Sequence, residues 1–551
     1  MKKFLVVLIA ILILSGCSNI QSKDYDTLIN EAASSKYDIV NTYRTGYKYY
    51  APGNMDISNI LDYNETLEDS SHKYYFYVDV VSYYNRVIEN YEVNPEAYYS
   101  KVINYQDKYG YIEINKWKNS LSIKKRALVI KGLRQIGKTT VVLNYCKKNY
   151  ENLVYINFME NKSIKKIFDN DLVVDDLIRD ISAAIPTARF IPQKTVIFFD
   201  EIQECASART SIKSFMIDGR FDIIATGSLL GLRGYNQKEQ KSIPTGFEYV
   251  VSMFPMDFEE YLWARGIDDS LIEYINNCFV KKEIVSDVVN DSFLNYFKEY
   301  LCVGGMPDAV DTFLKTRDMN QVRDVQRNIL EEYKDDFGKH LDKYENERID
   351  KLELTRIIDV YNSIPYQLAK ENNKFQFSDI RKGAKGREYK SAITWLEEFG
   401  LVKRSYNLNN LELPLEGNKN PDEFKLFLSD TGLFVAMLDE GTTNDIINGN
   451  LKIFKGAIFE NIVADAFIKN GNNLYYFSKN SGLEIDFITK FDGKLTPVEV
   501  KATNGNAKSL KEVINNKNKY GVDSALKLID GNIGYSNGIY TIPLYMAFLI
   551  D

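Results

Sequence analysis

Nine residues from Gly132 to Thr140 have the types and spacing of a phosphate-binding loop. They read Gly-Leu-Arg-Gln-Ile-Gly-Lys-Thr-Thr, which matches the Walker A pattern G-x-x-x-x-G-K-T. Glycines let backbone N–H groups wrap around phosphates, and a following helix adds the positive end of its dipole. In such a loop Lys138 reaches the β- and γ-phosphates of ATP, and Thr139 binds Mg²⁺. The predicted nucleotide-binding residues are Gly132, Leu133, Arg134, Gln135, Ile136, Gly137, Lys138, Thr139 and Thr140.

Acidic residues end a second apolar segment. The run Thr195-Val-Ile-Phe-Phe leads into Asp200 and Glu201, about 60 residues after the loop, as expected for a Walker B strand. Asp200 is expected to hold Mg²⁺ through water, and Glu201 to polarise the attacking water. The two motifs together predict ATP hydrolysis.

A third apolar segment, residues 221–228, ends at Ser228. This serine either hydrogen-bonds the γ-phosphate or the attacking water, or caps a helix. Lys138, Glu201 and Ser228 are therefore the candidate catalytic residues. Candidates for further phosphate contacts, which the sequence does not rank, are Arg134, Arg209, Arg220 and Arg233.

The C-terminal region holds a possible second site. Asp486 lies in Gly482-Leu-Glu-Ile-Asp-Phe, and Glu499 and Lys501 form Glu-Val-Lys, which together resemble a PD-(D/E)xK nuclease motif. On a strand, Glu499 and Lys501 point to the same face. Asp486 and Glu499 are candidate ligands of a second Mg²⁺ or Mn²⁺, Lys501 would steady the attacking water, and Glu460 would orient the set. The alternative is an inherited fold whose site is inactive or only binds.

The elements that position these residues follow from hydrophobic patterning. Strand-like runs such as 126–130 alternate with helical runs such as 141–148, which predicts a parallel doubly wound sheet with its ligand at the strand C-termini. Residues 267–345 are charged and amphipathic, as expected for a helical lid or connector.

Residues 346–410 read as helix, turn, helix and short hairpin, which resembles a winged helix. A basic cluster within this segment either contacts nucleic-acid phosphates or forms the solvated face of a protein-docking module, because Glu388, Glu397 and Glu398 interrupt the charge. The cluster consists of Arg381, Lys382, Lys385, Arg387 and Lys390.

The N-terminus predicts a different kind of protein. Residues 1–17 combine Lys2 and Lys3 with an apolar run that is too short for a comfortable membrane span. Their end, Leu-Ser-Gly-Cys17, resembles a bacterial lipoprotein signal in which Cys17 is lipidated; the alternative is a buried N-terminal helix or strand. Residues 18–110 are rich in tyrosine and are expected to form a small α+β segment. Its tyrosines either pack a half-buried sheet or bind carbohydrate or peptide.

Composition is that of an ordinary globular chain. Of 551 residues, 45% are hydrophobic and 26% charged, and the formal charge is −7, which argues against a protein that coats nucleic acid over its whole surface. The five cysteines are scattered and the two histidines isolated, so neither a disulfide framework nor a zinc site is expected.

The combined motifs resemble a family of prokaryotic AAA+-type P-loop ATPases whose C-terminal half contains a restriction-endonuclease-like domain of unknown function. The matching pieces include GLRQIGKTT, FFDEIQ, ATGSLLG and VGGMPDAV, and the resemblance covers about residues 112–551. It implies a multidomain α/β protein that uses ATP and Mg²⁺. The expected parts are a signal peptide at 1–17, a Tyr-rich segment at 18–110, an AAA+-like ATPase domain at 111–266, a helical connector at 267–345, a winged helix at 346–410 and a nuclease-like domain at 411–551.

Three functions are compatible with these parts. The first is an ATP-driven switch or remodeller with a nuclease-like effector, and the second is an ATP-gated enzyme that cleaves DNA or RNA. The third is a membrane-anchored surface lipoprotein fused to an incidental ATPase. Residues 1–17 imply a membrane location and residues 112–551 the cytoplasm, so we interpret the chain as two unrelated parts joined near Gly110 that share few contacts.

Overall fold

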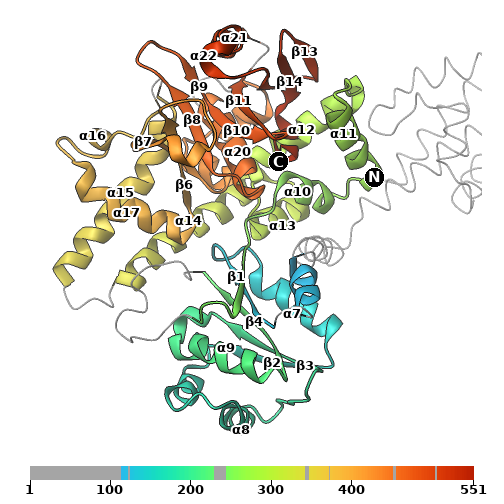
Figure 1. Ribbon diagram of the computed structural model, residues 1–551, viewed down its shortest axis with the longest axis vertical. Helices are drawn as coiled ribbons and strands as arrows, with labels where there is room; N and C mark the ends of the chain where they lie inside the picture. The colour runs from blue at the N-terminus through green and yellow to red at the C-terminus, as the bar shows by residue number, and fades with distance from the viewer. Residues whose placement is uncertain are drawn as a thin grey trace, which may run out of the picture. The chain divides into compact units, whose positions relative to one another are not determined.

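The computed structural model describes residues 113–121, 125–228, 244–341, 347–370, 373–450, 455–502 and 505–550 (Figure 1). The chain divides into two units, residues 1–98 and 99–551, and every described residue lies in the second. The predicted signal peptide with Cys17 and the Tyr-rich segment therefore lie outside the described residues. The prediction that the two parts share few contacts stays a prediction.

A parallel five-stranded sheet carries the Walker motifs. Its strand order is β2-β3-β4-β1-β5, and every neighbouring pair is parallel. The doubly wound sheet predicted from patterning is confirmed. The strands are β1 (Ala127–Lys131), β2 (Asn152–Asn157), β3 (Thr195–Asp200), β4 (Asp222–Gly227) and β5 (Glu248–Ser252).

Alternating residues of the strands build two separate cores, one on each face of this sheet. Val129, Ile197 and Phe199 pack with α8 (Val174–Ala184) and α9 (Ala206–Asp218). Their neighbours Leu128 and Phe198 pack on the opposite face with α7 (Lys138–Asn149). Because both faces are covered by helices, the strands read as continuous apolar runs, and polar residues are left to their C-terminal ends.

Five helices follow the sheet, and the last four of them lie within residues 267–345, where a helical connector is expected. Helix α14 is the longest of the described helices and reaches back to the loop between β1 and α7, as described below. The helices are α10 (Phe258–Ala264), α11 (Asp269–Lys281), α12 (Asp287–Val303), α13 (Pro307–Thr316) and α14 (Met319–Leu341).

The next part contains the expected helices and hairpin. Helices α15 (Glu347–Leu368), α16 (Phe377–Ile380) and α17 (Gly386–Phe399) precede the antiparallel strands β6 (Val402–Leu408) and β7 (Lys419–Leu428). The hairpin spans the domain boundary expected at residue 410. Its strand β6 also pairs with β8 (Leu474–Ser478) of the last part, so the two expected domains share a sheet.

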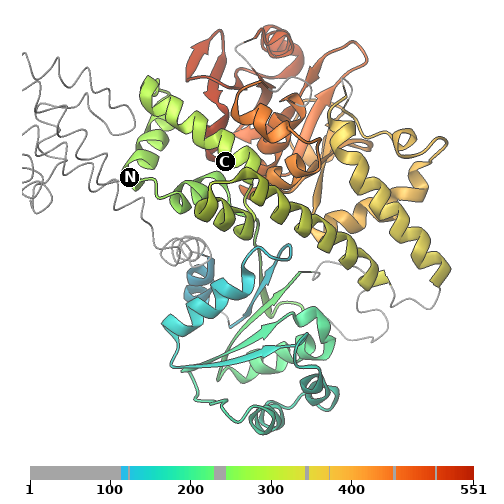
Figure 2. The same ribbon diagram turned by 180° about the vertical axis from the view of Figure 1, so that it is seen from behind.

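The C-terminal part is a mixed α/β structure. Helix α18 (Thr431–Ala436), helix α19 (Thr442–Ile447) and the long helix α20 (Lys455–Lys469) follow β7 in the chain. This part contains two sheets, one of order β7-β6-β8-β9, which includes the hairpin, and one of order β10-β11-β12-β14-β13. Figure 2 shows it from behind, in orange and red. The remaining elements are β9 (Glu484–Ile485), β10 (Phe487–Phe491), β11 (Lys494–Lys501), α21 (Lys508–Asn515), α22 (Lys517–Tyr520), β12 (Ala525–Ile529), β13 (Gly534–Ser536) and β14 (Ile539–Pro543).

A seam of glycines joins this part to the connector. A Cβ on Gly432 would lie 2.5 Å from the backbone nitrogen of Gly304, and one on Gly304 would lie 2.9 Å from the Cα of Gly432. Gly305 packs as closely against the segment after β5, where a Cβ would lie 1.9 Å from the carbonyl oxygen of Met256. Only glycine fits such approaches. Among the described residues, no helix combines the length and apolarity that crossing a membrane requires.

Candidate nucleotide-binding site

The predicted phosphate loop links the C-terminal end of β1 to the N-terminus of α7. Gly137 has a φ of 89°, and a Cβ on Gly132 would lie 2.2 Å from the carbonyl oxygen of Met253. Both positions therefore require glycine, one for its backbone conformation and one for close packing. The loop has the strand–loop–helix setting that distinguishes a Walker A site from a chance match.

Lys138 is held against the loop itself. Its Nζ donates to the carbonyl oxygens of Gly132 at 3.2 Å and Leu133 at 2.6 Å. Burial lowers the pKa of Lys138 to about 8, although the carboxylates of Glu201 and Asp200 oppose this shift. Within the described part of the chain no carboxylate is bonded to this ammonium, which would gain stabilisation from an incoming phosphate.

Asp200 ends β3 and is surrounded by hydroxyl groups. The Thr139 hydroxyl lies 3.1 and 3.0 Å from its two oxygens, and Tyr155 donates to Oδ2 at 2.9 Å. Thr226, on β4, also donates to it. Thr139 and Asp200 are the groups that would hold Mg²⁺ in a P-loop ATPase, and their contact shows that they fit this role.

Glu201 follows directly and has a φ of 53°. This left-handed conformation is unusual for a glutamate and turns the chain into the short helical segment Ile202–Glu204, where the side chain of Gln203 donates to Glu201. Glu201 is therefore held at the C-terminal edge of the sheet, beside Asp200, where the Walker B prediction requires it.

Ser228 lies just past β4, and its hydroxyl accepts a 3.4 Å hydrogen bond from Nε of Arg134. It does not precede a described helix, because the described chain breaks after it. Of the two roles considered, the geometry brings Ser228 to the phosphate loop.

The structure ranks the candidate arginines. Arg134 lies in the loop, whereas Arg209 forms a two-pronged ion pair with Glu248, at 2.9 and 3.0 Å. Arg220 pairs with Asp218 and Asp175 on the surface. Arg233 lies outside the described residues.

Helix α14 also contacts the loop, which the sequence does not reveal. Tyr333 donates to the carbonyl oxygen of Arg134 at 3.0 Å, and Gln135 donates to Glu332. The acidic and aromatic pattern of α14 indicates an amphipathic helix but does not indicate its partner, about 200 residues away in the chain.

A second group of carboxylates lies in the C-terminal part. Glu460 on α20, Glu484 on β9 and Asp486 surround the buried Lys425 of β7, whose Nζ lies 3.3 Å from Glu460 and 3.1 Å from Glu484. Burial raises the pKa of Glu460 to about 7, against the opposing effect of Lys425. Lys425 thus supplies a positive charge to these acids from within the protein.

The predicted motif residues Glu499 and Lys501 lie next to this group. Lys501 pairs with Glu499 at 2.7 Å, and one oxygen of Asp486 accepts from the backbone N–H of Val500 at 2.7 Å. Oε2 of Glu499 is buried and has no hydrogen-bond partner among the described residues. The described residues contain no group of three or more His, Cys, Asp or Glu arranged to hold a metal ion. The second metal therefore stays a prediction.

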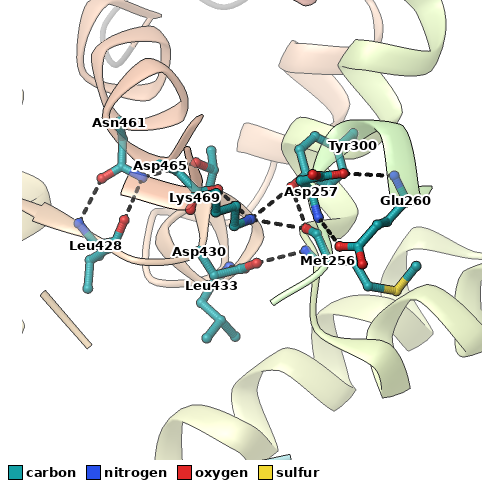
Figure 3. A network of polar contacts seen from close by, with 12 residues as sticks. Met256, Asp257, Glu260, Tyr300, Leu428, Asp430, Leu433, Asn461, Asp465 and Lys469 are labelled. Carbon is teal, nitrogen blue, oxygen red and sulfur yellow. Dashed lines mark hydrogen bonds and ion pairs between the residues drawn. The ribbon is translucent and has the colours of Figure 1, made fainter. Parts of the chain in front are cut away.

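A buried polar network connects the chain after β5 to α20 (Figure 3). Nζ of Lys469 donates to the carbonyl oxygen of Met256 at 3.0 Å, to Tyr300 at 3.2 Å and to Asp465 at 2.9 Å. Asp430 accepts from the backbone N–H of Gly305 at 2.7 Å. The last strand of the P-loop sheet is thus followed by a segment bonded to the C-terminal part.

Comparison with known proteins agrees with this geometry. Residues 124–262 match the family described as an AAA domain. Residues 294–444 and 455–546 match two domains of unknown function, DUF8612 and DUF4143. Sheet order, loop geometry and family match together define residues 124–262 as a P-loop ATPase domain of the AAA class.

Solved structures give a weaker likeness. A Walker-type ATPase of Pyrococcus abyssi shares 15% identity at a TM-score of 0.35, covering 59% of this chain and 93% of its own. The ORC2 protein of Aeropyrum pernix, in complexes with ADPNP and ADP, shares 12% identity at a TM-score of 0.32, covering 66% of this chain and 94% of its own. None of the curated proteins compared with the chain matches it.

Proposed function

We propose that this protein is a Mg²⁺-dependent ATPase that works as a switch or remodeller, with the winged-helix-like and nuclease-like parts as its effector. The observation that carries the proposal is the meeting of Lys138, Thr139, Asp200 and Ser228 at the C-terminal ends of β1, β3 and β4. ATP-binding sites of open parallel sheets lie at this edge.

Each residue has a chemical task in hydrolysis. The loop N–H groups and Lys138 bind the phosphates, and Glu201 orients a water and accepts its proton as that water attacks. Mg²⁺, held by Thr139 and Asp200, supplies positive charge to the β- and γ-phosphates when bound. Ser228 and Arg134 stabilise the charge on the γ-phosphate.

Two sets of contacts support transmission to the effector. Helix α14 touches the phosphate loop through Tyr333 and packs by the same ring against Phe399 of α17, at 5.9 Å between centroids. On the other side, Lys469 bonds the segment after β5. A change in the loop on nucleotide binding would therefore act on both following parts.

The test is ATP hydrolysis by the full chain, measured as Mg²⁺-dependent phosphate release. Lys138→Ala should lose nucleotide binding, whereas Glu201→Gln should bind ATP and not turn it over. Lys147→Ala, on the exposed side of α7, serves as the matched control. Unchanged hydrolysis in Glu201→Gln, or no nucleotide binding by the native chain, would refute the proposal.

ATP-gated cleavage of DNA or RNA is the second candidate, favoured by the convergence of Glu460, Asp486, Glu499 and Lys501. The five basic residues predicted to contact nucleic acid or a protein partner are all exposed around α17. Cutting of single- or double-stranded substrates should then need Asp486 and Glu499, and Glu512→Gln on exposed α21 is the control. Cleavage that survives Asp486→Asn would exclude this site as its source.

We also propose that the protein is attached to a membrane through Cys17. This attachment does not depend on ATP hydrolysis. Residues 1–17 carry the signal for it, and cell fractionation of the native chain beside Cys17→Ala tests it. If the native chain is found only in the cytosolic fraction, membrane attachment is wrong and the protein works in the cytoplasm, where ATP is supplied.

A further inference from the structure

Arg134 of the phosphate loop is bonded to a residue of the connector helix α14. Its Nη1 lies 2.6 Å from Oδ2 of Asp336, and its Nε lies 3.4 Å from Oγ of Ser228. The Arg134 side chain is 20% exposed and that of Asp336 only 5%. One guanidinium therefore joins the loop, the end of β4 and α14.

Other groups of α14 reinforce this contact. Tyr333 bonds the Arg134 carbonyl oxygen, and Glu332 bonds the side chain of Gln135. A cavity of about 230 Å³ lies between the loop and the helix, lined by Arg134, Gln135, Glu332, Tyr333, Asp335 and Asp336. The wall of this cavity that α14 forms is thus acidic.

Phosphates and this helix compete for the same positive charge. ATP brings several negative charges to the loop, and a carboxylate already paired with Arg134 both occupies the arginine and repels them. The ion pair of Arg134 with Asp336 is largely shielded from water, so breaking it costs free energy that phosphate binding must supply. Full engagement of Arg134 by phosphate therefore breaks the contact between the loop and Asp336.

We infer that Asp336 acts as a latch, because its ion pair with Arg134 holds α14 against the nucleotide-free loop. Phosphate binding captures Arg134 and thereby releases α14. This inference rests on the proposed ATPase function and assigns its regulation to one ion pair. The packing of α14 shows which helix would move with it. Phe337, next to Asp336, stacks edge-on against Trp395 at 5.1 Å and Phe399 at 5.7 Å, so displacement of α14 displaces α17.

The matched pair of variants is Asp336→Asn and Asp335→Asn. Both remove one negative charge from the same turn of α14, but Asp335 is exposed and no bond joins it to Arg134 among the contacts of the described residues. ATP affinity of the full chain is measured by titration calorimetry with the Glu201→Gln background to prevent turnover.

Asp336→Asn should bind ATP about tenfold more tightly than Asp335→Asn, within the range of ordinary coupling between sites. Equal affinities would overturn the latch while leaving the ATPase intact. Weaker binding by Asp336→Asn would also overturn it, because Asp336 would then position Arg134 for phosphate. Failure of the native chain to bind ATP would instead contradict the proposed function.

A second measurement does not depend on the folding of Asp336→Asn. Gln135→Cys and Glu332→Cys are combined and joined by a short bismaleimide, since these two side chains are in contact. A non-hydrolysable ATP analogue with Mg²⁺ should lower the cross-linking yield several-fold, and ADP should lower it less. A yield unchanged by either nucleotide would overturn the latch.

Discussion

Two buried lysines in this protein face opposite electrostatic situations. Lys138 donates to two backbone carbonyl oxygens, and burial lowers its pKa to about 8. Burial also acts to lower the pKa of Lys425, but the carboxylates of Glu460, Asp486 and Glu484 outweigh it and raise the pKa. Among the described residues no carboxylate is bonded to Lys138, whereas Lys425 is bonded to Glu460 and Glu484.

The difference teaches how to tell a binding lysine from a structural one. Near Lys138 the carboxylate of Asp200 is held by hydroxyl groups, so both charges are available to an incoming anion and its metal. At Lys425 the neighbouring carboxylates already bind the ammonium within the fold. We expect loss of Lys138 to affect ligand chemistry and loss of Lys425 to affect folding.

The largest expected effect is on stability. Lys425→Met removes the buried positive charge that three neighbouring acids share and should lower the free energy of unfolding of the C-terminal part by about 3–5 kcal/mol. Hydrogen exchange of α20 and β11 measures this locally, with Lys490→Met on the exposed side of β10 as the control. Adding Glu460→Gln should restore part of the loss. If Lys425→Met and Lys490→Met exchange hydrogen at similar rates, Lys425 is not the structural lysine that the comparison with Lys138 requires.

A smaller effect is expected on the pH dependence of ATP affinity. Phosphate favours protonated Lys138, so binding should weaken as pH rises above about 8, by up to about tenfold per pH unit. The stability of the nucleotide-free domain changes in the opposite direction, because a lysine whose pKa is lowered in the folded state contributes stability above pH 10.5 that is lost as pH falls through 8. Calorimetry between pH 7.5 and 9.5 measures the affinity.

Lys138→Arg is the control for this titration, since a guanidinium stays charged throughout the range. Its affinity for ATP should vary little with pH. An equally steep decline in native and variant chains would mean that another group titrates, and the contrast between the two lysines would lose its functional meaning.

The smallest effect concerns the hydroxyl groups around Asp200. Tyr155→Phe removes one hydrogen bond of 2.9 Å to this carboxylate, which is worth about 0.5–1.5 kcal/mol. Asp200 keeps Thr139 and Thr226, so hydrolysis should fall only two- to tenfold. The Mg²⁺ dependence of the rate measures the change. A complete loss of activity would show that Asp200 is held as rigidly as the acids around Lys425.

The nucleotide site could be predicted because its residues form short contiguous motifs. Gly132–Thr140 and Thr195–Glu201 each place their chemistry at the end of a buried strand, and the parallel sheet brings the two ends together. The parallel sheet and its two-sided core follow from the same alternation of strands and helices, whereas the strand order does not.

Lys425 and Asp336 could not be predicted from the same reasoning. Lys425 is 35 residues from Glu460 in the chain, and Asp336 is 202 residues from Arg134. A signal did exist for Lys425, because a single lysine in the apolar run Phe424–Leu428 indicates a buried charge that needs a partner. The sequence of α14 contains no pattern that indicates a contact with the phosphate loop.

The glycine seam has a genetic consequence. Gly304 and Gly432 allow the connector and the C-terminal part to approach until their backbones touch. A methyl group at either position would push the two surfaces apart without altering any residue of the nucleotide site. A random mutagenesis screen should therefore recover alleles at these codons that keep ATP turnover and lose whatever output the C-terminal part delivers, a separation-of-function class defined by backbone contact alone.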